Sequence, residues 1–202
     1  MLLAVGFVLA LSAVSAVLAG CASTAAHRKA AAGTAAPGTT TVHFRAYSPG
    51  DELAVPVADV VRGQCWTTSI AAPSAHAYRC FQGNKILDPC FAPAHAASPV
   101  QVACLGAPWS RALMLQVSGK LPAPSAATAV SRPWAFQLAN GVRCVASTGT
   151  VPAVAGVNLA YHCADGADAA LGAVSGTRLT AQYANPGAGA LATTTVTTIW
   201  DA

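Results

Sequence analysis

Seven cysteines are the residues of this chain with the widest choice of chemistry, because a cysteine can ligate a metal, attack a substrate or form a disulfide. Six of them lie beyond residue 60: Cys65, Cys80, Cys90, Cys104, Cys144 and Cys163. They form no Cys-x-x-Cys pair and no zinc-ribbon arrangement with histidine, so we expect no bound metal. An even number can pair completely and leave no free thiol for catalysis. We therefore expect three disulfides.

The pairing follows from a stretch without large side chains, residues 122–131, which separates four of these cysteines from two. Cys144 and Cys163 lie alone beyond it, so we predict that they pair. The other four allow three connectivities, and sequence alone does not choose among them. We predict Cys65–Cys80 and Cys90–Cys104 because neighbours close short loops between turn-rich stretches. Closing a loop of about 15 residues stabilises a fold by about 3 kcal/mol in the chain-entropy model.

Other groups able to catalyse a reaction do not form a motif. No Gly-x-Ser-x-Gly occurs, which argues against the nucleophile elbow of the α/β-hydrolases. The histidines His43, His76, His95 and His162 lie in unrelated contexts, and Asp88 precedes a proline, where turn initiation explains it. We expect no enzymatic activity and no cofactor. A carboxylate and a histidine could still converge in space, which leaves a hydrolase as an alternative.

Aromatic and polar side chains crowd around Cys65, Cys80 and Cys90. Four of them are candidates for contact with a ligand: Trp66, Arg79, Asn84 and Asp88. Such a mixture is typical of a pocket for a saccharide, peptide or lipid. The alternative is that the aromatic rings cover disulfides while Asn84 and Asp88 form turns. Arg79 then either binds a carboxylate or phosphate with its planar fork, or pairs with Asp88 as a structural clamp.

The amino-terminal residues carry the seventh cysteine. Residues 2–19 are uncharged, with the length of a signal-peptide core or a short spanning helix. They run into Leu18-Ala19-Gly20-Cys21, which resembles the lipobox of bacterial lipoproteins. The resemblance implies that residues 1–20 are a signal peptide and that the Cys21 thiol carries diacylglycerol, with further acylation of the new amino group. Two acyl chains anchor a protein stably to a bilayer. The alternative is an uncleaved anchor with an incidental cysteine.

A tether is expected after the lipobox. Residues 22–41 contain no large apolar side chain and cannot bury enough surface to offset their ordering entropy. We predict that residues 21–41 are a lipid-anchored flexible tether and that residues 42–202 form the extracytoplasmic domain. The net charge of +4 is spread thinly, apart from His27, Arg28 and Lys29. We therefore expect no nucleic-acid partner.

Alternating patterns predict a mainly β fold for the domain. Trp134, Phe136 and Leu138 alternate before Asn140-Gly141, which is the strongest short signal for a hairpin. "TRLTAQYA" and "ATTTVTTIW" predict a last hairpin around residues 185–187. "QCWTTSIA", "PVQVACL" and "ALMLQVSG" are further strand candidates, whereas "APSAHAYRCF" could form a helical turn. We expect one disulfide-stapled domain of two small β lobes, at about 42–121 and 132–202, with an α+β fold containing short helices as the alternative.

One passage has a resemblance of its own. "GQCWTTSIAAPSAHAYRCFQGNKILDPCF", residues 63–91, resembles a C-W-T-x-S-I-A…A-Y-R-C…G-N-x-I-x-D-P-C-F signature of poorly characterised actinobacterial exported proteins and lipoproteins. The similarity continues loosely through "PWAFQLANGVRC". Similar modules in outer domains of membrane sensor kinases would imply binding. Ser74 and His76 replace the basic and the acidic residue expected in relatives. The resemblance implies a location and a fold class but no activity.

Together these expectations describe a lipoprotein on the outer face of a bacterial cytoplasmic membrane. We expect a non-enzymatic binding or sensing role in the cell envelope, with the bilayer and a cell-wall or other envelope ligand as partners. A hydrolase acting on envelope polymers is the first alternative. A structural or assembly component with a protein partner is the second.

Overall fold

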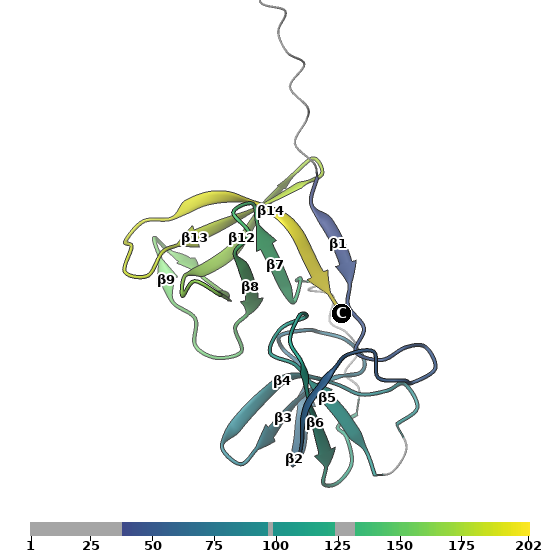
Figure 1. Cartoon of the computed structure of the whole chain (residues 1–202). Coiled ribbons are helices and arrows are strands. Elements are labelled where there is room, and N and C mark those ends of the chain that lie inside the picture. Colours follow the sequence, from purple (N-terminus) through teal and green to yellow (C-terminus); the bar gives the residue numbers. More distant parts are fainter. Residues whose placement is uncertain (1–37, 97–98, 124–131) are drawn as a thin grey trace, which may run out of the picture. The chain divides into compact units, whose positions relative to one another are not determined.

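The computed structural model describes residues 38–96, 99–123 and 132–202, and in these ranges all regular secondary structure is β (Figure 1). The predicted mainly β, disulfide-stapled fold is confirmed. The helical turn expected within residues 72–81 is wrong, because Ala77–Gln82 forms strand β3. The described residues form no helix able to cross a membrane. The predicted signal peptide, Cys21, most of the tether and residues 124–131 of the predicted linker lie outside the described residues.

The first lobe is a closed barrel in which each strand pairs with the next, and β6 closes the barrel by pairing in parallel with β2. A tight turn at Gly83, whose φ is 56°, joins β3 to β4. Glycine adopts this left-handed conformation at no steric cost. The strands are β2 (Val57–Thr68), β3 (Ala77–Gln82), β4 (Lys85–Phe91), β5 (Gln101–Cys104) and β6 (Ala112–Val117).

Two disulfides fill much of the interior of this barrel. Cys65–Cys80 joins β2 to β3 and Cys90–Cys104 joins β4 to β5, each between residues that face one another across the ladder. The Sγ atoms of Cys80, Cys90 and Cys104 all lie within 4.8 Å of one another. The sulfurs are packed with buried side chains of the same barrel, which include Tyr78, Leu87, Val102 and Leu115. So small a barrel has little room for a large core, and the covalent bridges supply part of its cohesion.

The second lobe is a sheet with strand order β1-β14-β13-β12-β11-β8-β7, closed by a further pairing of β14 with β7. The long last strand pairs with β13 through its first half and with β7 through its second half. Its strands are β1 (Thr40–His43), β7 (Ala135–Leu138), β8 (Arg143–Ala146), β11 (Tyr161–Cys163), β12 (Asp168–Ser175), β13 (Arg178–Ala184) and β14 (Ala192–Asp201), beside a separate hairpin of β9 (Ala153–Val154) and β10 (Val157–Asn158).

Strand β1 is where the structure differs from the expected boundaries. Thr40–His43 pairs in parallel with Thr198–Asp201 of β14, so the strand begins inside the expected tether and belongs to the second lobe. Three of its four residues, Thr40, Thr41 and Val42, are β-branched, which favours a strand. Their composition says nothing about the partner, which is the last strand of the chain. The chain then passes through residues 44–56 into the first lobe.

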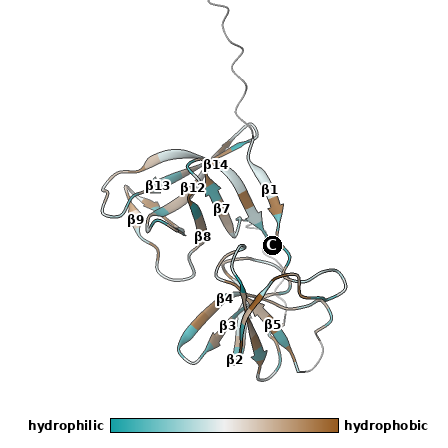
Figure 2. Cartoon of the chain, in the orientation of Figure 1, coloured by the Kyte–Doolittle hydropathy of each residue, from teal (hydrophilic) through white to brown (hydrophobic). Residues whose placement is uncertain are grey.

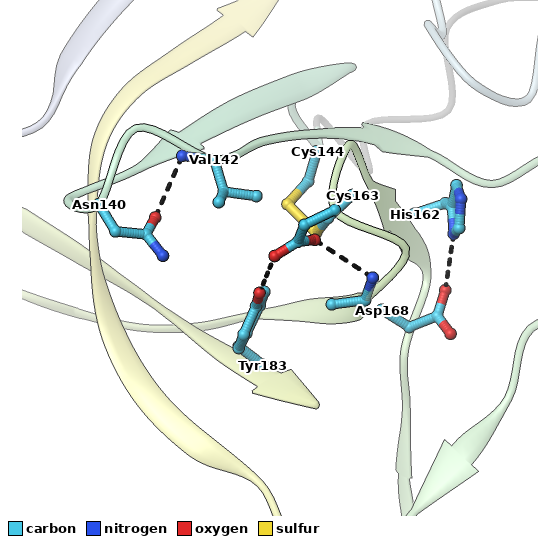
Figure 3. The surroundings of a disulfide bond; sticks show 9 residues. Asn140, Val142, Cys144, His162, Cys163, Asp168 and Tyr183 are labelled. Atoms are coloured by element: carbon cyan, nitrogen blue, oxygen red, sulfur yellow. Dashed lines mark hydrogen bonds and ion pairs between the residues drawn. A yellow bond between two sulfur atoms is a disulfide. The ribbon is translucent and has the colours of Figure 1, made fainter. Parts of the chain in front are cut away.

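The third disulfide and the hairpin beside it follow the sequence pattern closely (Figure 3). Asn140 Oδ1 accepts a hydrogen bond from the Val142 amide, at 3.1 Å, and Gly141 has φ 86° in the turn between β7 and β8. Cys144 on β8 then faces Cys163 on β11 and is bonded to it. All three predicted cysteine pairs are therefore disulfides in the structure.

One apolar cluster includes residues of both lobes. Its centre is Trp134, whose ring centroid lies 5.0 Å from that of Phe44 and 5.6 Å from that of Phe91. Phe91 ends β4 of the first lobe, whereas Phe44 follows β1 and Trp134 precedes β7. Aromatic pairs at such distances contribute beyond their buried area. Figure 2 also marks hydrophobic residues on β1 and β2, although the side chains of β1 are exposed and do not belong to this cluster.

Candidate functional site

Three of the four residues predicted for ligand contact lie together, and Asn84 lies apart. Trp66 is 45% exposed on β2, with its ring 5.5 Å from that of Phe81 and the Arg79 guanidinium 5.5 Å above it. Arg79 in turn lies 3.8 Å from Asp88, between Nε and Oδ2. Asn84 is exposed in the turn between β3 and β4. The four residues do not surround a common cavity.

Asp88 has no surface to offer a ligand, because its side chain is 0% exposed. Its carboxylate accepts hydrogen bonds from the Ser69 hydroxyl and from the Ile70 amide. Burial raises the pKa of Asp88 above its ordinary value, and these donors, together with Arg79, oppose the rise. The expected turn role of Asp88 is wrong, since the residue lies inside β4 with its carboxylate buried.

Arg79 is also engaged on the protein side. Its side chain is 18% exposed, and Nη2 donates a hydrogen bond of 2.9 Å to the Thr148 carbonyl, which belongs to the second lobe. Nε is buried and makes no hydrogen bond, so the contact with Asp88 is an ion pair at longer range. The geometry therefore matches the structural-clamp hypothesis for Arg79 and Asp88. Under the ligand hypothesis Asp88 would contact the ligand, but its side chain is not exposed.

An open cleft of about 460 Å³ lies elsewhere, beside the segment that leads from β1 toward β2. We call it the β1–β2 cleft. Residues 43–49 and Asp51 form one part of the lining, residues 201–202 complete it, and the first lobe contributes Ser74, His76, Phe91, Ala92 and Ala94. Its volume falls in the range of about 300–1,000 Å³ that small-molecule sites occupy. Sequence analysis named His43 and His76 without bringing them together.

Both carboxylates of the β1–β2 cleft already have a histidine partner. His43 Nδ1 lies 2.8 Å from Asp201 Oδ1, and His95 Nδ1 lies 3.0 Å from Asp51 Oδ2. Asp51 also accepts hydrogen bonds from the amides of Ala94, at 2.8 Å, and of His95, at 3.1 Å. Desolvation acts to raise the pKa of Asp51, but these hydrogen bonds outweigh it and lower the pKa below its ordinary value.

Arg45 and His76, which also line the cleft, differ from the two aspartates in their contacts. Among the described residues neither the Arg45 guanidinium nor the His76 imidazole has a hydrogen-bond or ion-pair partner. The apolar wall beside them includes Phe44, Phe91 and the ring of Tyr47. Burial first, and then the nearby Asp51 carboxylate, raise the pKa of Tyr47 to about 12. The cleft thus combines a free cation with aromatic surface.

The cleft offers weaker support for catalysis than for binding. The Ser48 hydroxyl accepts hydrogen bonds from the amides of Gly50 and Glu52, and no hydrogen bond among the described residues joins a serine of the cleft to a histidine. The sole metal-ligand grouping in the described parts of the chain is Cys80, Cys90 and Cys104, whose sulfurs are already bonded in disulfides. Among the described residues, the histidine–carboxylate pairs at the cleft are His43 with Asp201 and His95 with Asp51, and only in the first of them do both residues line it.

No local pattern in the sequence indicates this cleft, because long-range pairings assemble it. His43 reaches Asp201 only through the parallel pairing of β1 with β14. Asp51 reaches residues 94 and 95 across the first lobe, and its own φ is 63°. The signal available in the sequence was the Pro49-Gly50-Asp51 turn, which says nothing of its distant partners. Comparisons with protein-family models, with curated proteins and with solved structures find no match to this chain.

Proposed function

We propose that this protein is a lipid-anchored extracytoplasmic module that binds a small envelope ligand in the β1–β2 cleft without converting it. The observation that carries the proposal is the cleft itself, which joins an aromatic wall to a cation that forms no ion pair with the described residues. Three disulfides suit an oxidising compartment outside the cytoplasm. The lipobox resemblance at Cys21 supplies the proposed membrane anchor.

Blocking the cleft tests the binding proposal. The full chain, purified in detergent, is heated with and without an extract of bacterial envelope small molecules. We expect the extract to raise the melting temperature of the wild type and of Ala75→Trp, but not of Ser74→Trp. Ser74 lines the cleft, whereas the neighbouring Ala75 is exposed outside it. Equal shifts in all three proteins, or no shift in any, would contradict the proposal.

Membrane anchoring is tested separately at Cys21. We expect intact-mass analysis to show a chain that begins at Cys21 and carries a diacylglyceryl group. Cys21→Ala should leave an uncut precursor or release the protein from the membrane, because the acyl chains supply the stable attachment. An unmodified Cys21 thiol in membrane-bound wild type would overturn the anchor.

Hydrolysis is the second candidate, and one contact favours it. The 2.8 Å pair of His43 with Asp201 could orient the imidazole to accept a proton from water. The described residues add no nucleophile to that pair, so water would have to attack directly. Under this hypothesis purified protein degrades an envelope ester or peptidoglycan fragment, and His43→Gln abolishes the activity. Activity that is unchanged in His43→Gln, or absent from the wild type, would reject it.

A further inference from the structure

The charges around the β1–β2 cleft narrow the class of ligand that it accepts. Two acidic residues line it, Asp51 and Asp201, and each contacts a histidine. Asp51 also accepts two backbone hydrogen bonds. The remaining titratable and charged side chains of the lining are Arg45, Tyr47 and His76, and Ala202 at the end of the chain also lines the cleft. Arg45 carries a permanent charge and forms no ion pair with the described residues.

The shape of an arginine side chain matters to what it binds. Its guanidinium presents several N–H donors in one plane, which match the two oxygens of a carboxylate or the oxygens of a phosphate. His76, from the first lobe, lines the same cleft, and its imidazole, which has no partner in the described parts of the chain, can add a donor. Hydrogen bonds to a charged group are stronger than those between neutral groups.

The wall beside this charge is apolar. Phe44 and Phe91 both line the cleft, and their ring centroids lie 5.4 Å apart. Phe44 also contacts Trp134, so the two phenylalanines are held by the core that both lobes share. A wall held in this way is already in place before a ligand arrives, which reduces the entropy lost on binding.

We infer that the ligand of the β1–β2 cleft carries a carboxylate or phosphate bound by Arg45 next to an apolar group that contacts Phe44 and Phe91. This inference rests on the proposed function and adds the chemical class of the ligand. It also gives Arg45 a different role from Arg79. Both are arginines near aromatic rings, but Arg79 already has a carboxylate and a carbonyl as partners, whereas Arg45 has neither among the described residues.

Four small probes test the inference on the full, isotope-labelled chain in detergent. Phenyl phosphate and benzoate carry both features, benzyl alcohol lacks the charge and inorganic phosphate lacks the ring. We expect the two aryl anions to shift the amide signals of Ala92 and Ala94 and the Nε–H signal of Arg45. Benzyl alcohol and inorganic phosphate should each bind at least about tenfold more weakly, which corresponds to about 1.4 kcal/mol. The tighter of the two anions indicates whether phosphate or carboxylate is preferred.

Variants assign the effect to Arg45. Arg45→Gln should weaken the aryl anions to the level of benzyl alcohol, and Arg45→Lys should recover only part of the loss because lysine offers a point charge. Arg62→Gln, an exposed arginine on β2 outside the cleft, should bind as the wild type does. Unchanged affinity in Arg45→Gln, or equal affinity for benzoate and benzyl alcohol, overturns the inference.

The outcome for the ligand class is separable from the outcome for the proposed function. If the aryl anions fail to bind while the envelope extract still stabilises wild type and not Ser74→Trp, the inference is wrong and the cleft remains a binding site. If the extract also fails, the proposed function is wrong as well.

Discussion

The two lobes contain the same local arrangement with opposite exposure. In each lobe a buried tyrosine stands two residues before a disulfide-bonded cysteine, and the residue between them pairs with an aspartate of the next strand. The first lobe has Tyr78-Arg79-Cys80 with Asp88, and the second has Tyr161-His162-Cys163 with Asp168. The partner carboxylate is 0% exposed in the first lobe. In the second lobe the His162 and Asp168 side chains are 63% and 31% exposed.

A β-bulge accounts for the difference. Between β3 and β4 the register shifts from Tyr78↔Cys90 to Cys80↔Leu87, so the β4 strand has an extra residue opposite Arg79. A bulge of this kind bends the strand and redirects a side chain. In the second lobe His162 pairs regularly with Asp168 and stays on the outer face (Figure 3). We therefore expect burial, and not the mere presence of an ion pair, to determine how much each pair contributes to stability.

The largest expected effect is the loss of the buried carboxylate. Asp88→Ala leaves the Ser69 hydroxyl and the Ile70 amide without their acceptor and the Arg79 guanidinium without its anionic partner. We expect the free energy of unfolding to fall by about 3–5 kcal/mol, the range for breaking a buried pair, as measured by urea denaturation. The matched control Asp168→Ala should lose about 1 kcal/mol or less because its pair is exposed. Similar losses in both variants would break the comparison.

A somewhat smaller effect is expected from the single disulfide of the second lobe. Replacing Cys144 and Cys163 together by serine should lower the free energy of unfolding by about 3 kcal/mol, since the chain regains loop entropy when unfolded. Denaturation with and without reductant measures it. Peptide mapping without reductant checks the pairing itself. A link between Cys80 and Cys90 would show that the first lobe is joined differently from the structure.

A third effect concerns the two tyrosines of the comparison. The Tyr161 hydroxyl donates a hydrogen bond of 2.8 Å to the Pro133 carbonyl. Burial raises the pKa of Tyr161 to about 12, although Arg132 opposes the rise. Burial also raises the pKa of Tyr78. Because the folded protein then binds more protons than the unfolded chain, stability should fall as the pH rises from about 10 to about 12. Phenolate absorbance followed together with circular dichroism measures this coupling.

Tyr161→Phe sharpens the same point. The variant keeps the ring and loses the hydrogen bond, so it should lose about 1 kcal/mol at neutral pH. It should also lose part of the decline above pH 10. A variant that unfolds in alkali with the unchanged profile of the wild type would show that Tyr161 does not contribute to the pH dependence.

The smallest effect is expected at His162. Its imidazole lies 3.2 Å from Asp168 on the exposed face of β11. His162→Ala should change the free energy of unfolding by about 0.5 kcal/mol or less, as exposed pairs do. Arg79→Ala, at the equivalent position of the first lobe, leaves buried Asp88 without its cation and should lose several times more. Thermal unfolding of the two variants side by side measures the ratio, and a ratio near one would contradict the account.

Local patterns in the sequence predicted local structure well. Asn140-Gly141 formed its hairpin because glycine supplies the left-handed turn residue. The cysteines paired as neighbours because each pair lies on adjacent strands. The pairing of Asp88 with Arg79 was one of two alternatives from the sequence, but its place in a strand was missed. An Asp-Pro dipeptide is typical of a turn, whereas Asp88 lies at a bulge within β4. The cleft forms only when β1 pairs with β14. This pairing joins the two ends of the domain, and no local sequence pattern indicates it.

Native mass spectrometry of protein released from bacterial membranes tests the central claim, that the β1–β2 cleft of a lipid-anchored protein holds a small ligand, most directly. We predict a chain that begins at acylated Cys21 and carries a small bound molecule in the wild type and in Ala75→Trp. Ser74→Trp should carry the same acyl mass without the bound molecule, because the new side chain occupies the cleft. The same bound species in all three proteins, or none in any of them, would contradict the account.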